Sequence, residues 1–167
     1  VKRHAADILY DPAKTTPEKI QEAIYVPSKF RVQTPDPAAV DSIKVVTIRT
    51  EGMYDKMDIN YLGMQMRLTG KKIYGLETEF ACPLIVRVFM DPSEDLDEDW
   101  FEEIVEMETL QMPVHGGGTN EIELNYKFED YEGVTGNVST EEFIRSMFSP
   151  FKVQWKSRLE AAEGKTQ

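Results

Sequence analysis

A dense acidic stretch is the part of this sequence whose residue types most resemble a ligand set. Six oxygen-bearing side chains have the spacing of an EF-hand calcium loop, at positions 1, 3, 5, 7, 9 and 12 of that loop: Asp91, Ser93, Asp95, Asp97, Asp99 and Glu102. Leu96, however, occupies the position where the loop needs glycine for its sharp turn, and Glu98 stands where an apolar residue pairs two loops. The stretch is therefore interpreted as a solvated acidic turn, with a calcium-binding module as the alternative.

Residues that serve nucleophilic or metal chemistry are scarce. The histidines are His4 and His115, and the single cysteine is Cys82. His115 opens a His-Gly-Gly-Gly run like the oxyanion loop of some esterases, but that loop works with a Gly-x-Ser-x-Gly elbow, which is missing here. We therefore expect a flexible connector at His115 and a small core-strand residue at Cys82.

The acids themselves are a third source of chemistry. A pair of carboxylates can perform glycosidase-like acid–base catalysis. Among 30 acidic residues the sequence marks no particular pair, and a solvated acidic face explains them more simply. The sequence therefore predicts neither an enzyme nor a metal or cofactor site.

The overall charge restricts the partners. The formal net charge is −11, from 30 acidic and 19 basic residues. Binding to phosphates needs clustered lysine and arginine, so a protein that grips nucleic acid is disfavoured, whereas an acidic surface repels DNA. With one cysteine and no long apolar run, the sequence predicts an intracellular protein without an internal disulfide or a membrane segment.

The element around the acidic turn is a strand followed by a helix. Residues 84–90 alternate as a strand that is buried on one face and largely covered on the other, and Pro92 ends it. Asp97 is placed to cap a helix over 98–108, with Phe101, Ile104 and Val105 facing inward.

Alternating apolar residues predict further strands. Met57–Thr69 is the longest alternation, with Leu62, Met64, Met66 and Leu68 on one face, and a hairpin turn follows it at 69–72. A capping box at 139–142 predicts a short helix through 147. The expected strands cover 30–33, 42–50, 57–69, 73–74, 84–90, 120–130 and 151–156.

These elements predict a mainly β fold, a small antiparallel β-barrel or sandwich with one flanking α-helix and an N-terminal extension. The extension is residues 1–27, with a short helix after a capping box at 15–18. The β domain covers 28–158, and 159–167 is expected to be a flexible tail.

This order of elements resembles the tail tube proteins of contractile-tailed bacteriophages, which are related in fold to the tube proteins of type VI secretion systems. The likeness is spread over about residues 27 to 157. It is carried by the segments PSKFRVQTPDP, INYLGMQMRLTGK, PLIVRVFMDPSEDLDEDWFEEI, IELNYKFEDYEG and FSPFKVQWKS. Tyr61-Leu62-Gly63, Val86–Asp91 and Trp100-Phe101 look like the family's tyrosine–glycine strand, acid-ended strand and amphipathic helix.

The resemblance implies a structural virion protein, a tail tube subunit. Such subunits form hexameric rings that stack into a hollow tube, and DNA passes through its lumen during ejection. The implied partners are other copies of the chain, the tail sheath and the baseplate, in a tail assembled in the host cytoplasm. The N-terminal extension departs from the family, so a tube-initiating baseplate protein or a type VI-like ring protein is the alternative.

Two sets of residues are the expected sites of this function. By analogy with the family, the N-terminal segment and one loop are candidates for ring-to-ring contacts, and the loop residues are Gly52, Met53, Tyr54, Asp55, Lys56, Met57 and Asp58. The polar face of the strand at 120–130 is mostly acidic, and Glu121 and Glu123 are the candidates for lining the lumen.

Overall fold

Two runs of β-branched and large apolar residues form the centre of the fold. Strand β2 (Ser42–Glu51) pairs antiparallel with β4 (Leu84–Met90), which places Val46 opposite Val88 and Ile48 opposite Val86. These four side chains are almost completely buried. The computed structural model describes residues 9–16, 19–20, 29–54, 56–79 and 81–148, and every statement about structure concerns these residues.

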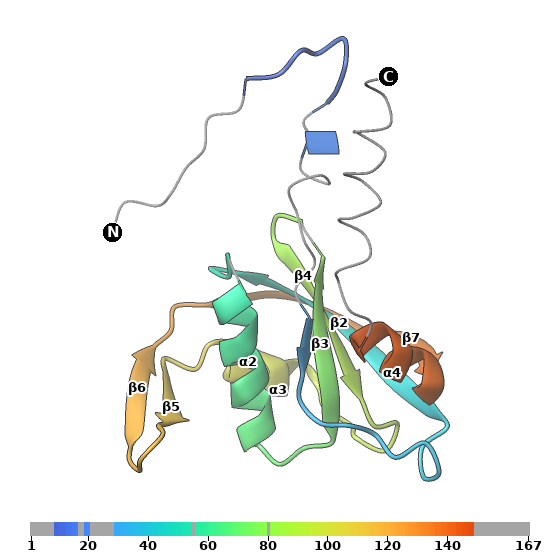
Figure 1. Cartoon of the computed structure of the whole chain (residues 1–167), viewed down its shortest axis with the longest axis vertical. Helices are drawn as coiled ribbons and strands as arrows, with labels where there is room; N and C mark the ends of the chain where they lie inside the picture. Colours follow the sequence, from blue (N-terminus) through green and yellow to red (C-terminus); the bar gives the residue numbers. More distant parts are fainter. Residues whose placement is uncertain (1–8, 17–18, 21–28, 55, 80, 149–167) are drawn as a thin grey trace, which may run out of the picture.

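β2 and β4 belong to a five-stranded antiparallel sheet. Its order is β1 (Lys29–Arg31), β3 (Ile73–Glu79), β4, β2 and β7 (Lys127–Ser139), so β1 and β7 are the two edges. A separate two-stranded hairpin consists of β5 (Thr109–Pro113) and β6 (Thr119–Glu123), and it extends away from the sheet in Figure 1.

Helices cover the two faces of the sheet unequally (Figure 1). α2 (Lys56–Leu68) and α3 (Glu98–Val105) lie on one face, where Leu62, Phe101 and Val88 share the main hydrophobic core. α4 (Thr140–Phe148) lies on the opposite face, where a smaller core surrounds Phe143. Burying each of these large apolar side chains stabilises the fold by about 2 kcal/mol.

The strand–turn–helix unit at the centre of the sequence forms where it was expected, although the helix ends at Val105 rather than at residue 108. Asp97 has extended backbone angles, and its carboxylate accepts a hydrogen bond of 3.1 Å from the Trp100 N–H, which makes it the N-cap of α3. Phe101, Ile104 and Val105 are the buried residues of this helix. The predicted strand at 42–50 and the helix after the second capping box are confirmed as β2 and α4.

The fold class is confirmed at the level of a mainly β protein, with 39% of the described residues in strands and 24% in helices. The finer description was wrong for the described residues, since they form three helices rather than one and an open sheet rather than a closed barrel. The expected helix in the N-terminal extension, the strand at 151–156 and the C-terminal tail lie largely or wholly outside the described residues.

The strand predicted at 57–69 is wrong, because this segment is helix α2. Its residues fit both periods: Leu62, Met64 and Met66 alternate, while Ile59, Leu62 and Met66 also recur at the helical spacing of three and four. Methionine, leucine, glutamine and arginine favour helix, and the predicted hairpin turn at 69–72 is instead the connection from α2 to β3.

The strand predicted at 120–130 is interrupted. β6 ends at Glu123 and β7 begins at Lys127, so the alternation of Ile122, Leu124, Tyr126 and Phe128 spans two strands in different sheets. β7 then continues to Ser139 with register shifts against β2 at three places, each adding one residue to β7: Glu129, Glu132 and Thr135. These bulges increase the twist of the edge strand.

Candidate functional site

The sheet face under α4 is apolar where the helix covers it and polar beyond the helix. The register places Gly75, Phe89 and Val45 side by side on neighbouring strands, and Phe143 of α4 packs on this row with its ring centroid 5.2 Å from that of Phe89. Apolar and small residues here are explained by the helix that covers them.

Beyond α4 the same face carries charged and hydroxyl side chains. Lys29, Glu77, Arg87 and Thr47 stand opposite one another across four strands, two residues along from the apolar row. We define the open sheet face as nine of the polar residues on this side of the sheet beyond α4: Lys29, Thr47, Arg49, Glu77, Glu79, Arg87, Asp130, Glu132 and Thr135.

Lys29, Arg49 and Arg87 of the open sheet face each have an acidic partner. Lys29 Nζ lies 3.3 Å from Glu77 Oε1, and Arg87 contacts Glu79. Arg49 contacts Glu132 at 2.6 Å and Asp130 at 3.9 Å. Four acids and three bases leave this face slightly acidic, with its cations already neutralised by neighbours.

A groove runs between α4 and the open sheet face. Its volume is about 390 Å³, and its lining combines Glu77, Arg87 and Glu142 with the apolar Val45 and Phe89. Because Glu77, Arg87 and Thr135 line it, the groove is continuous with the open sheet face.

The two edges of the sheet carry opposite charge. β1 contributes Lys29 and Arg31 and has no acid. β7 contributes Glu129, Asp130 and Glu132 against one lysine, Lys127. Within the described residues each of these strands has a neighbouring strand on one side only. A strand edge exposes backbone N–H and C=O groups that can pair with another chain.

The predicted contact loop connects β2 to α2 at one end of the strands. Gly52 has φ +86° and an added Cβ would lie 2.5 Å from the Asn125 carbonyl oxygen, so the position needs glycine. Met53 is buried against the core, whereas Tyr54 and Met57 are 73% and 49% exposed. Asp55 lies outside the described residues.

The remaining loop residues start the helix. Lys56 is the first residue of α2 and is exposed. Asp58 accepts hydrogen bonds from the Tyr54 N–H at 2.6 Å and from the Tyr126 hydroxyl at 2.9 Å, which fixes the loop against the segment that enters β7. Tyr54 in the loop and Met57 in the first turn of α2 are thus two exposed large side chains beside the fixed Asp58.

The candidate lumen residues lie on the separate hairpin. Glu121 and Glu123 are exposed on β6, opposite Gln111 and Thr109 of β5, and the Gln111 side-chain amide donates to Glu121. Their exposure to solvent agrees with the sequence pattern. They are in a different sheet from the open sheet face, so the structure does not bring the two sets together.

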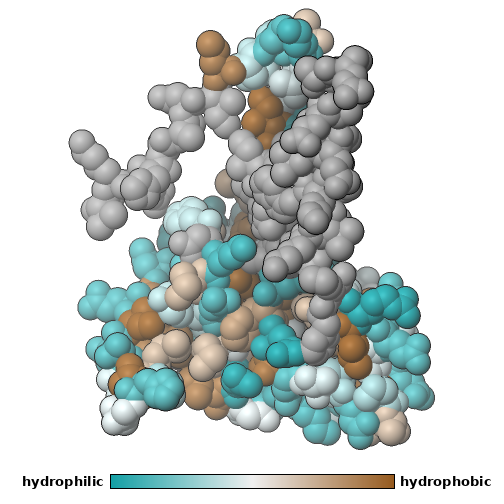
Figure 2. Space-filling view, in the orientation of Figure 1, coloured by the Kyte–Doolittle hydropathy of each residue, from teal (hydrophilic) through white to brown (hydrophobic). Residues whose placement is uncertain are grey.

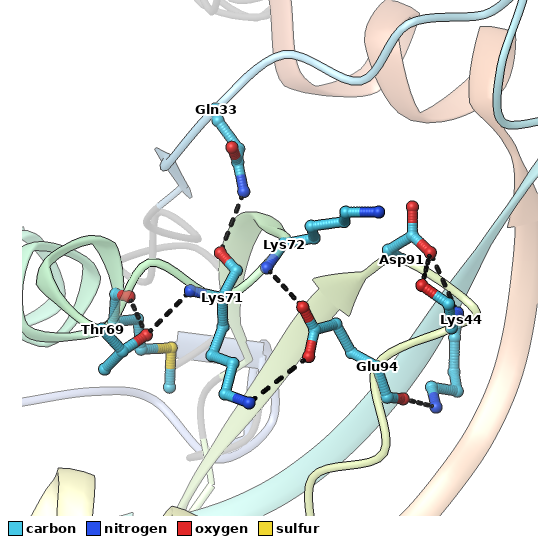
Figure 3. Close-up of polar contacts among 9 residues, drawn as sticks. Gln33, Lys44, Thr69, Lys71, Lys72, Asp91 and Glu94 are labelled. Carbon is cyan, nitrogen blue, oxygen red and sulfur yellow. Dashed lines mark hydrogen bonds and ion pairs between the residues drawn. The ribbon is translucent and has the colours of Figure 1, made fainter.

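The acidic turn after β4 is a structural corner. Glu94 contacts two other segments in this corner (Figure 3). Its carboxylate accepts a hydrogen bond from the Lys72 N–H at 2.9 Å and lies 3.8 Å from Lys71 Nζ. Its backbone carbonyl accepts a hydrogen bond from Lys44 Nζ of β2. Gln33 donates to the Lys71 carbonyl at 3.1 Å on the far side. The corner ties β2, the start of β3 and the end of β4 together.

Asp91 is the buried acid of this corner. It accepts from the Ser93 hydroxyl at 2.5 Å, the Ser93 N–H at 2.9 Å and the Tyr74 hydroxyl at 2.7 Å. The bonds from Ser93 and Tyr74 lower the pKa of Asp91 to about 2, while burial and the nearby carboxylate raise the pKa of Tyr74. Asp91 thus acts as an internal acceptor, and within the described chain no three His, Cys, Asp or Glu residues are arranged to hold a metal ion.

Two other residues that sequence reasoning singled out lie in turns. Cys82 was expected in a core strand, but it is exposed in the bend between β3 and β4, because Pro83 after it interrupts the strand pattern. His115 and its glycines form the loop between β5 and β6. Among the described helices, none is long and apolar enough to cross a membrane.

On the face of the molecule seen in Figure 2, apolar side chains are scattered. Figure 2 shows them in separate patches among hydrophilic residues rather than in one belt. The exposed large apolar residues include Tyr54, Met57, Met107 and Val134. Val134 is notable because it is 55% exposed on edge strand β7, opposite the fully buried Val46.

Sequence reasoning missed the open sheet face. Arg49 and Arg87 each interrupt an apolar strand, and this pattern indicates that each points to the polar face of its strand. It does not indicate which acids pair with them. Comparisons with protein-family models, with curated proteins and with solved structures found no match.

Proposed function

We propose that this protein is a structural subunit that joins other copies edge to edge into a ring, as in the tail tube of a contractile-tailed bacteriophage. The observation that carries the proposal is the opposite charge of the two sheet edges, basic β1 and acidic β7. An edge that recognises the other edge of an identical chain gives a head-to-tail contact, which closes into a ring when the rotation between copies allows it.

Ring closure also removes the exposed strand edges. A lone open sheet risks indiscriminate pairing at its edges, and natural proteins avoid this with bulges, charges or full closure into a barrel. β7 combines three bulges with three acids, so a generic strand is repelled while a basic partner is accepted. The closed barrel is then shared between copies rather than completed within one chain.

In such a ring the open sheet face lines the channel. The other face of the sheet carries α2 and α3, which then lie on the outside, toward the sheath, while α4 shares the channel side with the open sheet face. Lys29, Arg49 and Arg87 are each held by a carboxylate, which weakens their attraction for DNA phosphates and favours transit without binding. Glu121 and Glu123 stay predicted lumen residues, which this arrangement does not require.

Electron microscopy of the purified full-length chain in negative stain tests the proposal. Hollow rings are expected, stacked into tubes for a tube subunit, and single rings would indicate the tube-initiating role. Glu129→Lys combined with Asp130→Lys is expected to abolish rings, because it places like charges on both edges. Glu102→Lys combined with Glu103→Lys on exposed α3 is the matched control and should assemble normally. A chain that stays monomeric over all concentrations and salts would refute the proposal.

A further inference from the structure

The two edge strands of the sheet run in the same direction. Each neighbouring pair in the order β1-β3-β4-β2-β7 is antiparallel. The direction therefore alternates across the five strands, so the first and the last of them, β1 and β7, point the same way. The sheet thus offers other copies two edges of equal direction and opposite charge.

A ring that keeps one sheet face toward its channel determines how these edges meet. The axis that relates neighbouring copies then runs roughly along the strands, so the rotation preserves both the strand direction and the inward face. β7 of one copy therefore meets β1 of the next copy as a parallel pair. An antiparallel contact between these edges would turn every second copy over and place its open sheet face on the outside.

The charged side chains favour the parallel arrangement independently of the symmetry. Lys29 belongs to the open sheet face, and Arg31, two residues further along β1, points to the same face. On β7 both Asp130 and Glu132 contact Arg49 on this face. Only a parallel contact brings the bases of β1 and the acids of β7 to the same side of the joined sheet.

The apolar side chains of the two edges match in the same way. On the face toward α2, β1 carries the half-buried Phe30, and β7 carries Tyr131, packed on the main core, and Val134, which is 55% exposed. A parallel contact sets Phe30 on the same face as Val134. An antiparallel contact would set Lys29 and Arg31 beside these apolar side chains, where a cation gains no partner and loses water.

The spacing of the charges gives the register. Lys29 and Arg31 are separated by one residue, as are Asp130 and Glu132, and a parallel strand matches the two pairs in order. The two acids share a single base, Arg49, which leaves one negative charge for the neighbour. We propose that β1 of one copy pairs parallel with β7 of the next, with Lys29 beside Asp130 and Arg31 beside Glu132, an inference that rests on the proposed function.

Disulfide trapping in the full-length chain tests the direction of this contact. In a Cys82→Ser background, Arg31→Cys is combined with Glu132→Cys, and the assembled protein is oxidised. Four strand spacings of about 4.8 Å separate the two edges of one chain by roughly 19 Å. This distance is too long for a disulfide within one copy. We expect a ladder of covalent oligomers on a non-reducing gel, which ends at the ring size.

The matched control combines Arg31→Cys with Val134→Cys, which lies on the other face of β7. The parallel arrangement predicts no ladder for this chain, because the two sulfurs lie on opposite sides of the sheet. A ladder from the Val134→Cys chain, or none from the Glu132→Cys chain although both chains form rings in negative stain when reduced, would overturn the inference.

Charge reversal tests the register without a disulfide. Arg31→Glu should lose the rings, and adding Glu132→Arg should restore them, because opposite charges again lie side by side. Adding Asp130→Arg instead should not, since Lys29 is its neighbour. Rings restored by Asp130→Arg but not by Glu132→Arg would refute this register.

The state of the unmodified chain separates the inference from the proposed function. If it forms rings while the disulfide and charge-reversal results contradict the parallel contact, the inference fails and the ring proposal stands. If it forms no rings at any concentration or salt, the ring proposal itself fails, and the inference with it.

Discussion

Gln65 is a polar residue in an apolar setting. It is 1% exposed in α2, and neither atom of its side-chain amide has a hydrogen-bond partner in the described structure. A buried amide without partners costs about 1 to 3 kcal/mol. Gln65→Met keeps the side-chain length and removes this cost, so we expect the free energy of unfolding to rise by about 1 kcal/mol in urea denaturation.

The control for Gln65 lies two positions further along the same helix. Arg67 is exposed, so Arg67→Met should change stability by less than about 0.5 kcal/mol. A loss of stability in Gln65→Met would mean that the amide has a partner it depends on.

Asp91 gives the corner after β4 a pH dependence. Its pKa is about 2 in the folded protein, and the usual value is about 3.9. A carboxylate whose pKa is lower in the folded protein stabilises the fold at any pH above the pKa of the unfolded chain. This stabilisation is lost as the pH falls through the pKa of the folded protein. We expect Asp91→Asn to lower the free energy of unfolding by about 2 kcal/mol at pH 7, and by progressively less between about pH 4 and 2.

Urea denaturation of the two chains at both ends of this pH range measures the effect of Asp91. Asp99→Asn on the exposed side of α3 is the matched control for a lost carboxylate. A stability difference between the unmodified chain and Asp91→Asn that is the same at pH 7 and pH 2 would contradict the hydrogen-bonded carboxylate.

Among the elements, α2 depends on a close approach to β1. A Cβ added at Gly63 would lie 2.0 Å from Cδ1 of Phe30, which packs against the helix there. Gly63→Ala must displace the Phe30 ring or move α2 away from β1, and we expect it to destabilise the fold by about 2 to 3 kcal/mol in urea denaturation.

Two variants establish the cause at Gly63. Gly136→Ala in β7 adds the same methyl group where nothing lies within 4 Å, and it should be nearly neutral. Phe30→Ala combined with Gly63→Ala should cost less than the sum of the two single changes, because the clash needs both side chains. Strict additivity would show that Phe30 is not the obstacle.

The same elements show what the sequence could predict. The spacing of apolar residues fits a single period in four elements, which made them predictable: β2, β4, α3 and α4. Asp97 and the second capping box also marked the starts of the two helices. α2 was mistaken for a strand because the spacing of its apolar residues satisfies both periods, and the choice depended on packing, such as that of Gly63 on Phe30.

β7 was predicted only at its start, for a different reason. Its three bulges return Phe128, Tyr131 and Val134 to one face at every third residue, so no period of two is visible in the sequence. The candidate site was predictable as exposed loop residues, Tyr54 and Met57, but not as ion pairs, because Arg49 and Glu132 are 83 residues apart and only the register brings them together.

At the scale of the whole molecule, the edges and the strand ends point in different directions. In the proposed ring, pairing of the β1 and β7 edges would join copies sideways and leave the strand ends for contacts along the ring axis. The loop from β2 to α2 lies at such an end, next to the turn from β3 to β4, since Thr50 stands opposite Leu84. Sideways and axial contacts therefore use separate residues and can be changed independently.

This separation predicts the effect of the exposed apolar pair on stacking. Tyr54 and Met57 are 73% and 49% exposed on a loop that Asp58 fixes, so burying them between rings would favour tubes through the hydrophobic effect. Tyr54→Ser combined with Met57→Ser should leave rings intact and shorten or abolish tubes in negative stain. Met107→Ser, at an exposed apolar position after α3, should leave tubes unchanged. Tubes of normal length in the double variant, or the loss of rings together with tubes, would remove this loop from the axial contact.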